Sequence, residues 1–415
     1  MLSLKFTDEG FNSLISHNHS IRWLIGDVEI TFNPTKPGKI GKIWYRIFKV
    51  ALVPWIRISI VFTFFYVLFF LLNKAFGTLV IEGDVIGYKE DYVILTLITS
   101  GFLVLLSMRH MLAQFHNAFY TPGLLRGGDF ERFQQVFKRY RDILAMKCDW
   151  RWRTLIFGFM GVVILFFDVY LSFTGKQAQT WATMPLRYPW SWISNLIWSF
   201  FMWGIVVGNM LWYGMGCAIC GHIMQDRIKK EGLLRVIPVS PDGKGGLYVL
   251  AEFSFSLFLM FISTMPFVLG WLFQAKFNLP FQIGFPLALL LMGISFFYAL
   301  WPSHSAMKEA KKKEIERISL LFRRCYDHYV SLPAEDDNMD KILDQMSNLQ
   351  VLYEKTEKMP VWPFNASMII RFASLIVIPL TIFSVELVSN KDSIIYNEEL
   401  TQKVQFYIYK ILGMR

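Results

Sequence analysis

The chain has 415 residues, of which 54% are hydrophobic and only 18% are charged, and it includes 39 Phe and 14 Trp. Soluble domains carry nearer a quarter charged residues, so the composition argues against two or three soluble domains and favours a chain surrounded by lipid. The formal net charge is +10. Because Lys and Arg gather in one set of loops, the charge is typical of cytoplasmic loops, and we predict no specific nucleic-acid binding.

Residues 1–50 contain no apolar run long enough for a cleavable signal peptide. The first hydrophobic segment is therefore expected to act as an uncleaved insertion signal. One strand-like stretch, Val28–Phe32, is followed by the turn residues Asn33–Pro34 and Pro37–Gly38. These signals predict a small N-terminal cytoplasmic cap that contains a strand or a hairpin.

A helix needs about 20 mostly apolar residues to cross the hydrocarbon core of a bilayer. Windows of about that length recur along residues 51–302, and a further one follows at 363–388. The fold class predicted is all-α, a polytopic transmembrane helical bundle of about seven spans. The windows are Ala51–Asn73, Tyr92–Phe115, Thr154–Thr174, Trp190–Gly216, Leu247–Phe273, Pro280–Trp301 and Pro363–Val388.

The distribution of Lys and Arg between the windows predicts the orientation. The N-terminus and the alternate long loops together hold 31 Lys and Arg, whereas the intervening loops hold 5. The positive-inside rule therefore assigns the N-terminus and the long loops to the cytoplasm, with the bundle in the plasma (inner) membrane. All four cysteines fall on this side and are expected to be reduced thiols.

Helical patterns also occur outside the predicted spans. Apolar residues recur at helical steps over 129–147, and residues 303–362 are typical of an αα-hairpin. Its two helices are expected at Ser305–Val330 and Met339–Lys358. Residues 389–415 indicate an amphipathic tail; seven spans would place it outside the cell, and a last segment that enters the membrane and returns would place it inside.

A Gly-rich loop precedes the fifth window. Backbone amides in such a turn can bind an anion at a helix N-terminus. The alternative is a tight cytoplasmic turn with ordinary turn residues. The ligand-loop candidates are Asp242, Gly243, Lys244, Gly245 and Gly246.

Two segments resemble an uncharacterised bacterial family of polytopic inner-membrane proteins. The first is Pro241-Asp242-x-x-Gly245-Gly246-Leu247 before a membrane helix, and the second is Lys358–Asn365 before the last window. Family members carry His before the Pro, where this chain has Ser240, and Asp where this chain has Asn365. The resemblance implies a membrane architecture and a bacterial origin, and it implies no activity.

Ionisable or strongly polar residues inside predicted spans are candidates for function, because a charge in lipid is costly. The alternative is that they extend to the membrane surface or form structural pairs, such as Glu252 with Arg371. The pore or coupling candidates are Asp168, Arg109, Asn209, Glu252 and Arg371.

No motif or group of residues points to catalysis. The Cys217-x-x-Cys220 pair lacks a second pair for a metal site and is expected to pack as small apolar side chains. No enzymatic activity, cofactor or metal is predicted.

These observations predict a gated, homo-oligomeric membrane channel or pore-forming effector. The cytoplasmic helical region would control it by binding a protein or an anionic ligand, and a role in bacterial antiphage defence is one expectation. The alternatives are a transporter of a small anionic or amphiphilic solute and a membrane scaffold that anchors a cytoplasmic partner.

Overall fold

The computed structural model describes residues 2–6, 28–32, 54–80, 91–120, 137–140, 142–144, seven positions between 159 and 173, 184–231, 234, 236, 237, 246–274, 279–331, 339–364 and 366–389. The elements in these ranges are helical apart from one two-stranded sheet. Strand β1 (Leu2–Phe6) pairs antiparallel with β2 (Val28–Phe32). The predicted strand at Val28–Phe32 is confirmed, and the tail 390–415 lies outside the described residues.

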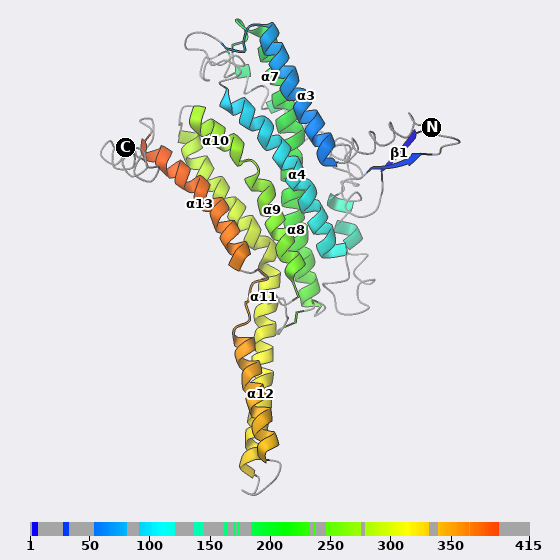
Figure 1. The fold of residues 1–415 in the computed structure, drawn as a ribbon, viewed down its shortest axis with the longest axis vertical. Helices are drawn as coiled ribbons and strands as arrows, with labels where there is room; N and C mark the ends of the chain where they lie inside the picture. Colours follow the sequence, from blue (N-terminus) through cyan, green and yellow to red (C-terminus); the bar gives the residue numbers. More distant parts are fainter. Residues whose placement is uncertain are drawn as a thin grey trace, which may run out of the picture.

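Apolar helices make up most of the described chain. Helices α4, α8 and α9 occupy the middle of the bundle, α3 and α13 lie on opposite sides of it, and α11 and α12 project from one end (Figure 1). The bounds are α3 (Pro54–Ala75), α4 (Tyr92–Tyr120), α7 (Pro189–Phe200), the π-helix η5 (Phe201–Val207), α8 (Gly208–Lys230), α9 (Tyr248–Ile262), α10 (Met265–Gln274), α11 (Leu279–Ser331), α12 (Met339–Glu357) and α13 (Ala366–Ser389).

Within the described residues, five helical segments are long and apolar enough to span a membrane. They fall on five of the seven predicted windows and are Pro54–Ala75, Ile94–Phe119, Tyr248–Gly270, Phe285–Ser331 and Ser367–Val385. The window Thr154–Thr174 lies mostly outside the described residues, with seven of its positions described. The window Trp190–Gly216 lies on the run α7–η5–α8 and is not among the five.

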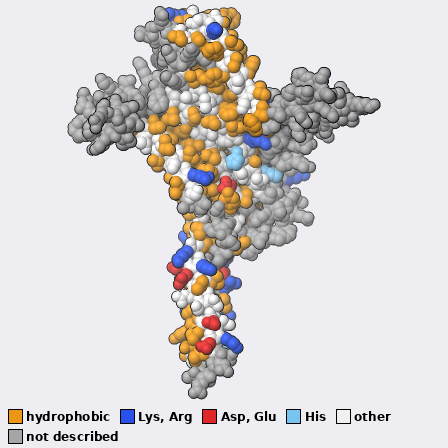
Figure 2. Space-filling model, in the orientation of Figure 1, with side chains coloured by type: hydrophobic (Ala, Val, Ile, Leu, Met, Phe, Trp, Pro, Cys, Tyr) orange, Lys and Arg blue, Asp and Glu red, His pale blue; other side chains and the backbone are white. Residues whose placement is uncertain are grey.

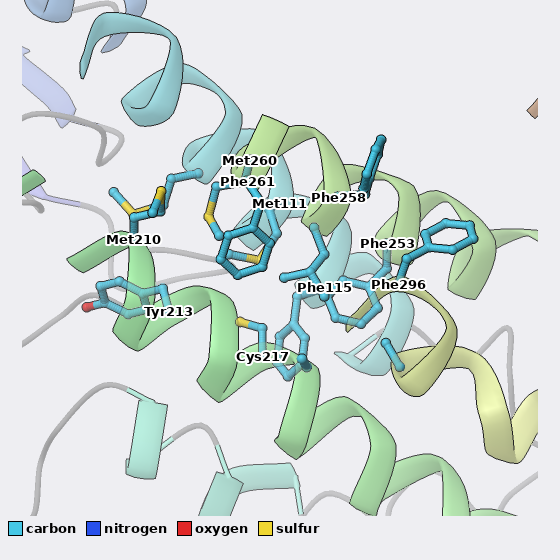
Figure 3. Close-up of a cluster of buried hydrophobic side chains, with 14 of the residues drawn as sticks. Met111, Phe115, Met210, Tyr213, Cys217, Phe253, Phe258, Met260, Phe261 and Phe296 are labelled. Carbon is cyan, nitrogen blue, oxygen red and sulfur yellow. The ribbon is translucent and has the colours of Figure 1, made fainter. Parts of the chain in front are cut away.

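The bundle core is built from Phe and Met side chains of α4, α8, α9 and α11, which converge on one another (Figure 3). Gly214 of α8 allows the close approach of α9, because a Cβ there would lie 2.4 Å from Met260 Cε. Gly221 lies two turns further along α8, and a Cβ there would lie 3.1 Å from a ring carbon of Phe253. Small residues on one face of α8 therefore set the spacing of the central helices.

A second packing centre surrounds Trp198, which is fully buried. Its ring packs on Phe65 of α3, with ring centroids 4.8 Å apart, and edge-on against Phe62 and Phe69 of the same helix. Phe201, the first residue of η5, stacks on Trp198 at 5.4 Å and also contacts Phe65, with ring centroids 5.4 Å apart. The wide turn of the π-helix thus begins where α7 packs against α3.

Helix α11 differs from the prediction. A span ending at Trp301 and a separate hairpin helix starting at Ser305 were predicted. The structure has one helix of 53 residues, with Pro286 and Pro302 inside it, and its length is about 80 Å. Its second half packs along α12, and Ile318 and Ile342 are buried in this pair of helices, which we call the hairpin.

Candidate functional site

The most elaborate polar arrangement in the described chain lies where α11 leaves the bundle, at Pro302. Proline has no N–H, so the carbonyl of Tyr298 loses its donor within the helix. His222 of α8 supplies the replacement, since its Nδ1 lies 2.8 Å from that oxygen. A carbonyl only accepts, so Nδ1 carries the proton. The two rings also stack, with centroids 4.2 Å apart and planes within 7°.

Gln225, one turn further along α8, holds the next carbonyl of α11. Its Nε2 donates to the Ala299 carbonyl at 2.8 Å, and its Oε1 accepts from the Ser303 hydroxyl. Both Gln225 and Ser303 are completely buried. Both ends of the Gln225 amide, the Ala299 carbonyl and the Ser303 hydroxyl are therefore hydrogen-bonded across the buried contact between α8 and α11.

The contact between α8 and α11 continues beyond the proline. Lys229 donates to the Ser305 hydroxyl at 2.7 Å and pairs with the Glu309 carboxylate at 2.9 Å. Successive turns of α8 thus hold successive turns of α11 on both sides of Pro302. We call the set His222, Gln225, Lys229, Pro302 and Ser303 the junction.

The segment that follows α12 is hydrogen-bonded to α11. The Nδ1 atom of His304 donates to the Val361 carbonyl at 2.9 Å, and its ring stacks on Trp362 with centroids 4.1 Å apart. Lys311 donates to the Met359 carbonyl at 3.0 Å. The segment after α12 is therefore fixed to the part of α11 that follows Pro302.

An aromatic cluster joins this segment to the bundle. Phe364 stacks on Phe296 of α11 at 5.6 Å, and Phe372 of α13 stacks on the same ring at 4.5 Å. The Ser254 hydroxyl of α9 donates to the Phe296 carbonyl at 2.7 Å and is fully buried. One turn of α11 thus contacts α9, α13 and the chain that leaves the hairpin.

Two of the predicted pore or coupling residues come together beside this cluster. The Tyr248 hydroxyl donates to the Glu252 carboxylate one turn along α9, and the charge of Arg371 on α13 acts on the same hydroxyl. Arg371 lies one residue before Phe372. Glu252 of α9 and Arg371 of α13 thus both act on Tyr248, and their pairing with each other stays a prediction.

The remaining candidates lie elsewhere. Arg109 is half-buried on α4, and Asn209 is buried on α8; each has interactions of its own. Asp168 and the loop residues Asp242, Gly243, Lys244 and Gly245 fall outside the described residues. Gly246, at the N-terminal end of α9, has a positive φ of 77°, which glycine adopts at little cost.

Both thiols of the Cys217-x-x-Cys220 pair are free and buried in the bundle core. Their placement agrees with packing as small apolar side chains. Among the residues that the structure describes, no three His, Cys, Asp or Glu side chains are grouped to hold a metal ion.

Sequence reasoning missed the junction. The signal available was Pro302 itself, a proline between an apolar and a charged helical pattern, together with the polar residues His222 and Gln225 spaced one turn apart. What the sequence does not show is that these two segments are adjacent. Comparison of the chain with protein families, curated proteins and solved structures found no match.

Proposed function

We propose that the protein is a gated membrane channel or pore-forming effector, homo-oligomeric, in which the hairpin of α11 and α12 controls the bundle. The observation that carries the proposal is the continuity of α11 through Pro302, with the junction holding both sides of the proline to α8. One continuous helix is shared by the hairpin and the bundle. A displacement of the hairpin therefore acts directly on α8, α9 and α13.

The strength of the junction bonds suits an α11 helix that has two states at Pro302. Pro302 supplies a natural bending point, and the buried bonds of Gln225 and Ser303 favour one bend angle. Loss of such a bond costs about 1–3 kcal/mol, and 1.4 kcal/mol is a factor of ten in an equilibrium constant. The junction is thus of the right strength to favour a closed state that a ligand or partner on the hairpin can overcome.

The placement in the membrane belongs to the proposal. The excess of Lys and Arg assigns the N-terminus and the hairpin to the cytoplasm, and the membrane is then the bacterial inner membrane. The two windows beyond the five described spans, Thr154–Thr174 and Trp190–Gly216, complete seven spans. A role in antiphage defence stays a prediction.

Ion flux from proteoliposomes containing the full chain tests the proposal. We expect flux that changes about tenfold in Gln225→Leu, which keeps the side-chain size and removes both junction bonds. Gln350→Leu is the matched control, because Gln350 is exposed on α12. Wild-type, Gln225→Leu and Asp168→Ala proteins that all fail to conduct under every condition would contradict a channel.

The two alternatives predict different results in the same vesicles. A transporter of a small anionic or amphiphilic solute gives saturable uptake that depends on a gradient. A scaffold gives no transport and retains a cytoplasmic partner through the hairpin. One observation favours the scaffold as the second candidate: the hairpin projects from the bundle and exposes large apolar side chains, including Leu320, Tyr326 and Val330.

A further inference from the structure

A groove of about 650 Å³ runs between α11 and α13 on the outside of the bundle. Its walls are apolar side chains of the two helices, among them Leu290, Phe297, Trp301, Phe372 and Ile376. The volume lies in the range of pockets that hold ligand-sized molecules. The lining residues fall on segments that are apolar enough to span a membrane.

The groove is open because α11 and α13 contact each other through aromatic pairs beside it and leave a space between their outer faces. Phe285 meets Phe383 with ring centroids 4.8 Å apart, and Phe296 meets Phe372 at 4.5 Å. On the groove side, α11 has Gly293, and a Cβ placed there would meet nothing within 4 Å. In a bilayer the space is therefore filled by hydrocarbon from outside the chain.

The end of the groove near the hairpin has the features of a membrane interface. Trp301 is 58% exposed and Tyr298 is 42% exposed, as expected for aromatic residues at headgroup level. Lys308 and Lys312 follow seven and eleven residues after Trp301, which returns them to the same face of α11. Lys308 lies about 10 Å beyond Trp301 along the helix. Charges are sparse over the bundle and frequent where the hairpin begins (Figure 2).

We propose that this groove is a binding site for an anionic phospholipid. One acyl chain lies between α11 and α13, and the phosphate headgroup contacts Lys308. Charge complementarity between an anionic headgroup and Lys308 and Lys312, which follow the groove on the same face of α11, favours this occupant. The inference depends on α11 lying in a membrane and does not depend on channel activity.

Such a lipid would sit directly beside the junction. Tyr298 and Trp301 line the groove, and their helix turn also carries the carbonyl held by His222. An anionic lipid would therefore stabilise the bend of α11 at Pro302 from the membrane side. The bound lipid would thus act on α11, the helix through which the hairpin is connected to the bundle.

Photo-crosslinking of the full chain in nanodiscs tests the site. The probes are phosphatidylglycerol and phosphatidylcholine, each with a photoreactive acyl chain. We expect phosphatidylglycerol to label peptides of α11 and α13 about fivefold more strongly than phosphatidylcholine, since a basic residue near an anionic surface contributes roughly that factor. Gly293→Leu fills the groove and should abolish labelling by both lipids.

Two controls separate the parts of the proposal. Lys308→Glu should reduce phosphatidylglycerol labelling to the phosphatidylcholine level, whereas Lys313→Glu, on another face of α11, should not. Leu291→Phe adds volume at an exposed position outside the groove and should leave labelling unchanged.

Three results would overturn the lipid site. The first is equal labelling by both lipids, and the second is labelling that survives in a folded Gly293→Leu protein. The third is a change of oligomer size in Gly293→Leu, measured by light scattering, without a change in labelling, which would make the groove a protein contact. Flux is measured separately, so that a silent channel does not count against lipid binding.

Discussion

The central and peripheral helices of the bundle have similar apolar sequences and different surroundings. In the apolar window of α4, half of the residues are buried inside the protein, whereas in α3 the share is 22% and in α13 it is 17%. The central helices pack on protein, and the peripheral ones present Phe, Leu and Ile to lipid. The difference teaches that hydrophobicity predicts membrane location, while glycine and sulfur-containing side chains mark the helices that pack on other helices.

The largest expected effect is the loss of a central aromatic side chain. Trp198→Ala removes a fully buried ring that packs on Phe62, Phe65 and Phe69, and we expect a loss of about 3–5 kcal/mol in the free energy of unfolding. Trp55→Ala is the control, because Trp55 is 58% exposed on α3. Unfolding in detergent followed by tryptophan fluorescence measures both, and equal losses would contradict the comparison.

A smaller loss in the free energy of unfolding is expected when a side chain is added between two central helices. Gly214→Leu places a side chain where Met260 and Phe261 already pack, and overpacking of this kind costs about 1–3 kcal/mol. Gly293→Leu is the matched change on the peripheral groove and should leave the midpoint of unfolding within error. The comparison fails if the two variants are destabilised to the same degree.

Removal of one interhelical hydrogen bond should cost less again. Ser254→Ala leaves the Phe296 carbonyl without its partner from α9, and we expect a loss of about 1 kcal/mol. Ser374→Ala is the control, because the Ser374 hydroxyl bonds only the Ile370 carbonyl of its own exposed helix turn. Unfolding followed by tryptophan fluorescence measures both variants. If the unfolding free energy of Ser254→Ala equals that of the wild type, the hydrogen bond between α9 and α11 does not contribute to stability.

The smallest loss in the free energy of unfolding is expected when an ion pair is broken. Lys229→Met breaks the pair with Glu309, in which the Lys side chain is 21% exposed, and should cost about 0.5 kcal/mol. Lys312→Met breaks a pair with Glu316 on the hairpin, where both side chains are mostly exposed and the atoms lie 3.8 Å apart, and should cost close to nothing. A salt titration distinguishes them, because screening weakens exposed pairs first.

Much of the fold could be predicted from the sequence. Four of the apolar windows agree with the candidate spans to within a few residues; for example, Pro363–Val388 corresponds to α13. The second hairpin helix was placed at Met339–Lys358 and runs over Met339–Glu357. These elements depend on local composition and periodicity, which a sequence shows directly. The strand at Val28–Phe32 was predicted on the same basis.

The candidate site could not be predicted, because it depends on contacts between distant segments. A proline between two helical patterns normally ends a helix. Pro302 does not, since His222, eighty residues earlier, donates to the Tyr298 carbonyl that it leaves without a donor, and Gln225 bonds the next carbonyl. The pairing of Glu252 with Arg371 was proposed only as an alternative, and in the structure both residues interact with Tyr248.

Pro302 has a consequence for how this protein can change through evolution. A replacement of the proline by alanine restores the internal donor for the Tyr298 carbonyl, so that the His222 imidazole then shares its acceptor with the helix. A replacement of Gln225 alone leaves a buried carbonyl and a buried hydroxyl unmatched. Substitutions at these positions should therefore occur together, and homologous sequences should show co-variation between residues 222, 225, 302 and 303.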